Sequence, residues 1–285
     1  MERKYKAVQN WCENNGYGTI QSVNPVGGGC INDGAVVETE QGSSFFVKTN
    51  PSAPPDMFPR EAEGLQKLAV DGGPTVPRVY HAQEEFILME NLRPASKVEG
   101  YWVQFGEELA SLHENRHDRF GFPHNNYIGS TPQINTWEED GFVFFAQHRL
   151  LYQARLGRDN GKLSRGDVKN VERVAQRLES LVPVQNPVLI HGDLWSGNAI
   201  TDQDGSPAII DPAAHYGWAE AELAMTSLFG GFPPAFYKAY EAYASLEAGY
   251  GDRFPIYNLY HLLNHVNLFG GGYLSQVRSV LHRYV

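Results

Sequence analysis

The sequence predicts an α+β protein with two lobes, a β-rich N-terminal lobe and a mainly helical C-terminal lobe. Two observations predict this division. Short apolar segments separated by turn residues fill the chain to about residue 90, interrupted by one helical segment. Beyond that point, longer segments with apolar residues at helical spacing dominate. Because 285 residues suffice for two modest domains, we divide the chain into 1–90 and 91–285.

The N-terminal lobe is expected to contain two helices and five strands. Tyr5, Val8 and Cys12 recur at helical spacing and predict a helix over 3–15. The same spacing predicts a second helix over 60–70. Strands are expected at 20–26, 35–39, 44–49, 78–81 and 85–90. On this assignment Cys12 packs in the core of the lobe.

The C-terminal lobe is expected to be helical except for a short strand and one inserted hairpin. Helices are expected at 100–114, 138–156 and 164–182, and in most of the chain from 219 onward. The stretch 116–136, rich in Gly, Pro, Asn and aromatic residues, is expected to be irregular. A buried strand at 187–190 precedes a loop, and strands at 199–201 and 208–211 flank an Asp-Gly turn. The loop and the hairpin therefore lie side by side.

Composition and charge exclude several classes of protein. Hydrophobic residues make up 42% and charged residues 20%, as in ordinary globular proteins and unlike disordered or fibrous chains. With 33 acidic against 23 basic residues, the net charge of −10 offers no broad surface for nucleic acid or anionic lipid. No apolar run approaches the ~20 residues that span a bilayer. Two cysteines are too few for a disulfide framework, so we expect a soluble, reduced protein of the cytoplasm.

The segment HGDLWSGN, residues 191–198, has the strongest chemical signal. Asp193 and Asn198 lie at the two ends of one tight loop, and the hairpin returns Asp211 beside them. A carboxylate can orient and deprotonate a hydroxyl nucleophile, while an amide and a second carboxylate offer the hard oxygen ligands that Mg²⁺ prefers. This set predicts phosphoryl transfer. Alternatively, Asp193 and Asn198 only satisfy backbone groups of the turn.

A second signal is Lys48, which ends an apolar strand downstream of a glycine-rich loop at 27–32. The order strand, glycine loop, strand and lysine is the one by which protein kinases cover and contact the phosphates of ATP. The loop lacks GxGxxG spacing and is not a Walker A motif, and Lys48 is alternatively a solvated side chain. Glu61 or Glu63 on the next helix can pair with Lys48, and we favour Glu61. Alternatively, both glutamates face solvent near the helix N-terminus.

The apolar strand at 85–90 ends at the junction of the two lobes. In a two-lobed kinase this connection supplies backbone hydrogen bonds to adenine. The nucleotide-binding residues are therefore expected to be Lys48, Glu61, Gly28, Gly29, Cys30, Glu90, Asn91 and Leu92.

HGDLWSGN, with Asp211 in a DPAxxYG context, resembles the fructosamine kinase and ketosamine kinase family, which has the protein-kinase-like fold shared with aminoglycoside phosphotransferases. The likeness covers nearly the whole chain. GGGCIN resembles the glycine loop of the family, FFVKTN its lysine strand, MFPREAEGL its helix with the pairing glutamate, and ILMENL its hinge. The Asp211 motif is Asp-Pro-Ala, unlike the Asp-Phe-Gly of protein kinases, so no activation-loop switch is expected.

The resemblance implies an ATP-dependent kinase that phosphorylates the sugar 3-hydroxyl of ketoamines, either free or on glycated protein lysines. The phosphorylated adduct is unstable and releases the amine, so the implied role is deglycation, a form of protein repair. The implied cofactors are ATP and Mg²⁺. Asp193 would be the base, Asn198 and Asp211 the Mg²⁺ ligands, Lys48 the phosphate contact and Glu61 its partner.

Several side chains near these motifs are candidates for the substrate pocket. Trp195 follows the proposed base and can stack on a sugar face, although large aromatic residues more often pack in cores. His261 and His265 stand one helical turn apart, but HLLNH lacks the glutamate of a zinc protease motif, so packing or a hydrogen bond is the better interpretation. The candidates for substrate contact are Trp195, His215, Tyr216, Trp218, Asn264 and His265.

Cys30 lies in the glycine loop, where backbone N–H groups and nearby positive charge can lower the pKa of a thiol. We therefore expect Cys30 to be redox-sensitive, with an oxidised form in which a disulfide links two copies of the chain. Alternatively, Cys30 is a small residue that fills the loop.

Two other functions are compatible with the sequence. One is a kinase for another small hydroxyl compound, such as an aminoglycoside, choline or a sugar. The other is a catalytically inactive nucleotide-binding module. The sequence also leaves open which ketoamine sugar is preferred (ribulosamine, erythrulosamine or fructosamine), whether the acceptor is free or protein-bound, whether the chain is a monomer or a homodimer, and whether its role is repair or catabolism.

Overall fold

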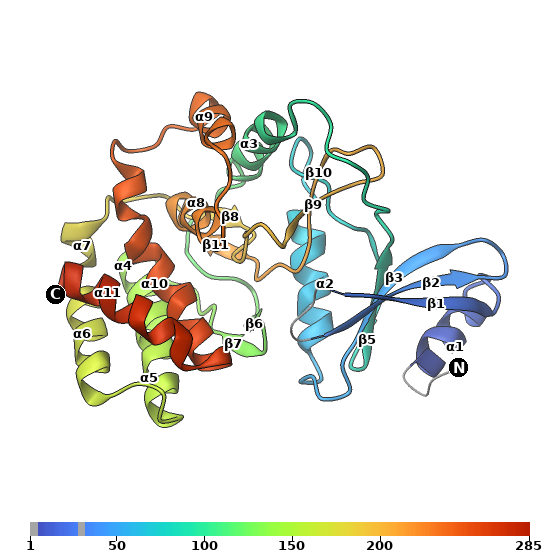
Figure 1. Cartoon of the computed structure of the whole chain (residues 1–285), viewed down its shortest axis with the longest axis horizontal. Coiled ribbons are helices and arrows are strands. Elements are labelled where there is room, and N and C mark those ends of the chain that lie inside the picture. Colours follow the sequence, from blue (N-terminus) through green and yellow to red (C-terminus); the bar gives the residue numbers. More distant parts are fainter. Residues whose placement is uncertain (1–4, 28–31) are drawn as a thin grey trace.

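The structure is a computed structural model that describes residues 5–27 and 32–285. It has two lobes, which lie at opposite ends of the molecule in Figure 1. The N-terminal lobe is an antiparallel five-stranded sheet with a helix on each side, and the C-terminal lobe is mainly helical. The predicted α+β, two-lobed fold is confirmed.

The sheet of the N-terminal lobe has the strand order β1-β2-β3-β5-β4. Its strands are β1 (Ile20–Val26), β2 (Asp33–Thr39), β3 (Ser44–Thr49), β4 (Val79–Gln83) and β5 (Phe86–Glu90). Because side chains alternate along a strand, Phe86 and Leu88 of β5 pack with α1 (Lys6–Asn14), while Ile87 and Met89 pack with α2 (Met57–Leu68). This two-sided burial explains why β5 is apolar throughout. Cys12 of α1 is fully buried in the first cluster, as predicted.

The second helix begins earlier than the sequence predicts. We expected it to start at residue 60, after a proline-rich loop, but α2 begins at Met57 and includes Pro59. A proline in the first helical turn removes an N–H that has no intrahelical partner in any case, so it does not prevent the helix.

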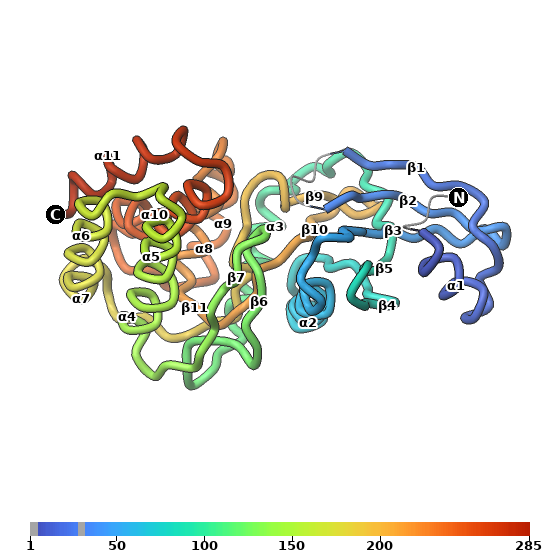
Figure 2. The backbone as a smooth tube through the Cα atoms, turned by 90° about the horizontal axis from the view of Figure 1, so that it is seen from below, coloured from blue at the N-terminus to red at the C-terminus, as the bar shows by residue number. Residues whose placement is uncertain are grey.

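The C-terminal lobe is built around α10, a 20-residue helix whose buried side makes it the centre of the largest core cluster. The tube view in Figure 2 shows α5, α6, α8 and α11 around it. The helices are α3 (Tyr101–Leu112), α4 (Gly141–Phe144), α5 (Tyr152–Asp159), α6 (Arg165–Ala175), α7 (Leu178–Leu181), α8 (Ala219–Ser227), α9 (Pro234–Tyr243), α10 (Tyr250–Phe269) and α11 (Leu274–Tyr284), with a π-helical segment η2 (Phe145–Leu151) and a 3₁₀ turn η3 (Gly271–Tyr273). In the described part of the chain, no helix has both the length and the apolar character needed to cross a bilayer.

Three strands of this lobe escaped prediction. β6 (Asn126–Ile128) and β7 (Thr131–Gln133) form a hairpin inside the stretch that we expected to be irregular. β11 (His215–Gly217) pairs with β8 (Val188–Ile190) in a separate two-stranded sheet. Each of these strands has three residues, too few to show a period of two in the sequence.

The predicted hairpin of β9 (Ala199–Thr201) and β10 (Pro207–Ile209) is present and is attached to the N-terminal lobe. The N–H of Thr75 donates to the carbonyl of Pro207, and the N–H of Ile209 donates to the carbonyl of Thr75, both at 2.9 Å. The loop that follows β8 and the loop that follows β10 are therefore held against the junction of the lobes (Figure 1).

Candidate active site

Lys48 forms ion pairs with carboxylates of both lobes. Its side chain extends from β3, is only 9% exposed, and donates from Nζ to Oε1 of Glu61 on α2 at 2.6 Å. It also donates to Oδ1 of Asp211. Burial alone would lower the pKa of Lys48, but the carboxylates of Asp211 and Glu61 outweigh it and raise that pKa. The lysine is therefore a fixed positive charge at the junction.

Glu61, and not Glu63, is the partner of this lysine. Glu63 points elsewhere and accepts hydrogen bonds from Arg60 at 3.1 Å and from His124 at 2.9 Å. The choice of Glu61 made from the sequence therefore agrees with the ion pair in the structure.

The loop that contains Asp193 is shaped by two buried side chains. The Nδ1 of His191 accepts from the N–H of Asp193 at 3.2 Å, and its Nε2 lies 2.8 Å from the carbonyl oxygen of Ile210. The carboxylate of Glu222, on α8, accepts from the N–H groups of His191 and Gly192. These contacts satisfy backbone donors that a tight buried loop would otherwise leave unpaired.

Asn198 holds the side chain of Asp193 from across the loop. Its Nδ2 donates to the backbone oxygen of Asp193 at 2.9 Å and to Oδ2 of the same residue at 3.3 Å. Burial, followed by the carboxylates of Asp211 and Glu222, raises the pKa of Asp193 well above that of an ordinary carboxyl group. A carboxylate with raised basicity, fixed by a neutral amide, is suited to accept a proton.

Asn198 and Asp211 each have an oxygen atom that is available for a cation, although Oδ1 of Asp211 accepts from Lys48. The amide of Asn198 donates through Nδ2, and among the described residues its Oδ1 accepts no hydrogen bond. Asp211 has a left-handed backbone with φ of 59° and a side chain that is 40% exposed. No group of three or more His, Cys, Asp and Glu side chains within residues 5–27 and 32–285 is arranged as a metal site. Two hard oxygen donors fit Mg²⁺, which commonly takes its other ligands from phosphates and water.

The predicted hinge lies beside the sheet. Glu90 is the last residue of β5, and its N–H donates to the carbonyl of Arg78 at 2.8 Å. The side-chain amide of Asn91 donates to Ser44 Oγ at 3.0 Å, and Leu92 is buried. These side-chain contacts fix the start of the connection between the lobes. Gly28, Gly29 and Cys30 lie outside the described residues.

Partly exposed aromatic rings continue from the catalytic loop towards α10. Trp195 makes an edge contact with Phe229, with ring centroids 6.1 Å apart, and Phe229 lies 4.7 Å from the ring of His265. Phe229 has a φ of 57°, a strained conformation for a bulky residue, which often marks a functional site. The Nδ1 of His265 lies 2.8 Å from the carbonyl oxygen of His261. This is a hydrogen bond of the kind that we favoured over a metal site.

Tyr216 and Trp218 do not join this group of rings. Tyr216 is buried and packs at a tilt against His117, with ring centroids 4.8 Å apart. Trp218 is buried against Phe145 at 5.2 Å. His215, also buried, faces a cavity behind the catalytic loop, and Asn264 accepts a hydrogen bond inside the core. The packing interpretation fits these four residues better than substrate contact does.

The whole-chain comparison decides the family. A family model described as fructosamine kinase matches residues 4–285. The chain belongs to the fructosamine kinase family. The prediction that it is a phosphotransferase of this family is thereby confirmed.

Other members of the fructosamine kinase family resemble the chain over most of its length. A protein named probable ketoamine kinase from Synechocystis sp. is 43% identical over 92% of this chain and 90% of its own length. Protein-ribulosamine 3-kinase, chloroplastic, from Arabidopsis thaliana is 40% identical over 98% of this chain and 87% of its own length.

Solved structures also resemble the chain over nearly its whole length. The crystal structure of a candidate fructosamine-3-kinase from Thermobifida fusca superposes with a TM-score of 0.89 and 34% identity, covering 99% of this chain and 98% of that one. Choline kinase from Streptococcus pneumoniae, at 14% identity and a TM-score of 0.66 over 99% of this chain and 100% of its own, shares the fold alone.

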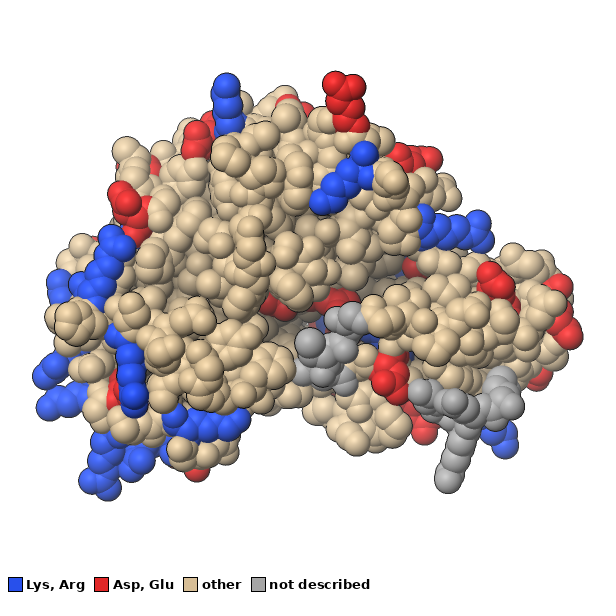
Figure 3. Space-filling view, viewed as in Figure 1, with Lys and Arg blue, Asp and Glu red and all other residues tan. Residues whose placement is uncertain are grey.

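Charged side chains are distributed unevenly over the face shown in Figure 3. Figure 3 shows acidic side chains in the hollow between the two lobes, whereas lysines and arginines gather on the C-terminal lobe at the lower left. A hollow lined with carboxylates favours cations.

Proposed function

We propose that the protein transfers the γ-phosphoryl group of ATP to the sugar 3-hydroxyl of a ketoamine, which is either a small molecule or an adduct on a protein lysine. The supporting observation is that Asp193, held by Asn198, lies beside the ion pair of Lys48 and Asp211. The names of the ketoamine kinase and ribulosamine 3-kinase relatives support the class of acceptor. In this proposal the phosphorylated adduct breaks down and releases the amine, so the outcome is deglycation.

Asp193 is the base of the proposed reaction. The hydroxyl proton passes to its carboxylate while the hydroxyl oxygen forms a bond to the γ-phosphorus and ADP leaves. Lys48, held by Glu61, contacts the phosphates and offsets their negative charge. Mg²⁺ held by Asn198 and Asp211 would neutralise further phosphate charge when bound.

The rest of the nucleotide site is proposed from its position in the chain. Residues 1–90 form the lobe that contains the glycine loop with Gly28, Gly29 and Cys30, and residues 91–285 form the lobe with the catalytic loop and the hairpin. Glu90, Asn91 and Leu92 frame the adenine. A disulfide through Cys30 and a cytoplasmic location stay predictions.

The acceptor is proposed to lie on the aromatic side of Asp193. Trp195 and His265 are partly exposed and linked through Phe229, so they offer a face for a sugar or for a protonated amine. His215, Tyr216, Trp218 and Asn264 are assigned to packing behind this surface.

The test is ATP consumption with Mg²⁺ on a panel of acceptors, using the wild type and Asp193→Asn. The panel contains ribulose-lysine, fructose-lysine, kanamycin, choline and a reaction without acceptor. Turnover on a ketoamine that is lost in Asp193→Asn is the expected result. Turnover on kanamycin or choline alone would reject the acceptor while keeping the base. An Asp193→Asn enzyme with most of its wild-type kcat would reject the base.

A further inference from the structure

His261, on α10, faces the carboxylate of Asp193 from the side opposite Asn198. Its Nδ1 lies 4.0 Å from Oδ1 of Asp193, whereas Asn198 contacts Oδ2. The imidazole is 5% exposed. Among the residues that the structure describes, no atom forms a hydrogen bond with this Nδ1, so a buried donor or acceptor is left without a partner next to the proposed base.

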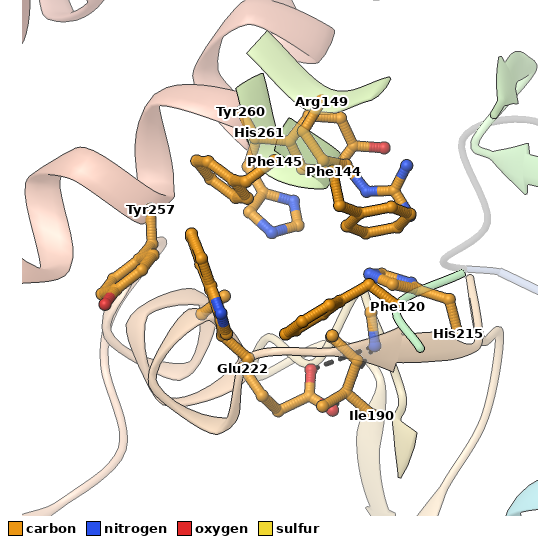
Figure 4. Close-up of a pocket in the computed structure, with 14 residues that line it drawn as sticks. Phe120, Phe144, Phe145, Arg149, Ile190, His215, Glu222, Tyr257, Tyr260 and His261 are labelled. Atoms are coloured by element: carbon orange, nitrogen blue, oxygen red, sulfur yellow. Dashed lines mark hydrogen bonds between the residues drawn. The ribbon is translucent and has the colours of Figure 1, made fainter. Parts of the chain in front are cut away.

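The side chain of His261 also lines a small cavity behind the catalytic loop. The cavity measures about 20 Å³, room for about one water molecule, and Arg149, His215 and Gly192 also line it. Figure 4 shows the ring of His261 directed into this space, with Arg149 and His215 beside it. The ring thus borders the cavity and also lies close to Asp193.

Burial, with His265 and Arg149 nearby, keeps the imidazole of His261 neutral, and Arg149 is the buried cation of this group. It is completely buried, and its guanidinium donates to the carbonyl of Ile134 at 2.6 Å and to Oδ1 of Asn135 at 2.8 Å. No carboxylate pairs with it among the described residues. Burial first, and then His265 and Arg149, lower the pKa of His261 to about 3, so the imidazole is neutral at neutral pH.

A neutral donor suits a base better than a cation would. A lysine or arginine on Asp193 would orient the carboxylate but lower its pKa, and with it the ability to take a proton. A neutral imidazole N–H orients the same oxygen with a much smaller effect on basicity. A closing movement of about 1 Å brings the observed 4.0 Å separation into hydrogen-bond range.

We propose that His261 is a positioning residue for Asp193: its Nδ1–H donates to Oδ1 while Asn198 donates to Oδ2, so that the carboxylate is held at both oxygens. This inference rests on the proposed function, because it takes Asp193 as the base. His261 itself does not touch the reacting atoms.

The test compares His261→Asn and His261→Leu with the wild type. The amide of asparagine can donate from nearly the same place, whereas leucine keeps the bulk and removes the donor. We expect His261→Leu to lose on the order of 10²-fold in kcat, and His261→Asn to stay within about fivefold of the wild type. The Kd for ATP and the melting temperature should change little in either variant. His282→Leu, an exposed histidine on α11, is the matched control and should be unaffected.

A direct readout keeps the proposal testable even if His261→Leu folds poorly. Nitrogen-15 NMR of the wild type, with the His261 signals assigned from His261→Asn, should show the Nδ1–H tautomer. An Nε2–H tautomer, a kcat of His261→Leu within threefold of the wild type, or equal losses in both variants would overturn the proposal.

Asp193→Asn separates this inference from the proposed function. If Asp193→Asn is inactive while His261→Leu is fully active, only the role of His261 fails. If Asp193→Asn keeps its kcat, the assignment of the base fails first.

Discussion

Lys48 and Asp211, 163 residues apart in the chain, form an ion pair that joins the sheet of the N-terminal lobe to the loop after β10. Glu61, on α2, accepts a hydrogen bond from the same ammonium group. One buried cation thus contacts a carboxylate on each side of the junction, and its position is set by both lobes. A charge fixed in this way needs little rearrangement to meet phosphates, which is the condition for strong electrostatic stabilisation.

Replacing this cation should therefore damage catalysis more than folding. We expect Lys48→Met to reduce kcat/KM for ATP by about 10²-fold or more, because it removes a preorganised positive charge. Glu61→Gln should cost about tenfold, since Asp211 still holds the lysine. Steady-state kinetics with varied ATP measures both. Lys6→Met, on the exposed side of α1, is the control. A Lys48→Met enzyme within threefold of the wild type would contradict this role.

The parts of the site that could be predicted are those whose residues lie close together or in a recognisable order. Asp193, Asn198 and Asp211 fall within one loop and one hairpin, so their proximity follows from local structure. Lys48 and Glu61 were predicted because a strand, a glycine loop, a strand ending in lysine and then a helix with glutamates form a recognisable order.

Glu222 was missed, and His261 was assigned to packing or a hydrogen bond without its proximity to Asp193, because their partners are distant in the sequence and their neighbours are apolar. Glu222 accepts from backbone groups 30 and 31 residues away, and in the sequence it looks like a solvent-facing charge on α8. A clue existed, since the polar residues of α8 are not gathered on one side, so the pattern marks no side of this helix for solvent. Conversely, Tyr216 and Trp218 follow the Asp211 motif, yet both are buried, Tyr216 on β11 and Trp218 directly before α8.

The contact between α3 and α9 offers a test of packing. A Cβ on Gly106 would lie 2.4 Å from the carbonyl oxygen of Phe236 and 2.9 Å from the Cβ of Ala239. Helix propensity favours alanine by about 1 kcal/mol, but overlap with a backbone atom cannot be relieved by a side-chain rotation and costs more. We expect Gly106→Ala to destabilise the protein by about 2 kcal/mol. Denaturant unfolding measures the change.

A matched control lies on α6. A Cβ on Gly166 would meet nothing closer than Ser164 Oγ at 3.6 Å, so Gly166→Ala should be neutral or stabilising by up to about 1 kcal/mol. Equal stability of the two variants would contradict the close approach of α3 to α9.

The buried carboxylate of Glu220 should depend on its arginine. Arg253 donates to its two oxygens at 2.7 and 2.6 Å, and the hydroxyl of Tyr257 donates at 2.8 Å. Because Glu220 is 1% exposed, removing the arginine leaves an unpaired charge in the core. We expect Arg253→Met to cost about 3 kcal/mol of unfolding free energy. Adding Glu220→Gln should recover part of that loss, whereas an equal or greater loss in the double variant would contradict the charge-based explanation.

Buried neutral histidines should make the protein less stable as the pH falls. The pKa of His261 is lowered to about 3 by burial, His265 and Arg149, whereas in the unfolded chain it is about 6.5. Between these two values the unfolded state binds a proton that the folded state does not, so unfolding is favoured on acidification; above about pH 6.5 neither state binds it and the effect vanishes. One such histidine lowers the unfolding free energy by about 2 kcal/mol between pH 6.5 and pH 5. His261→Asn should therefore lose less stability than the wild type over that range, and urea unfolding at pH 7, 6 and 5 measures the difference. Other groups titrate in both proteins and cancel in the comparison, so parallel curves for the two proteins would show that His261 is protonated in the folded state.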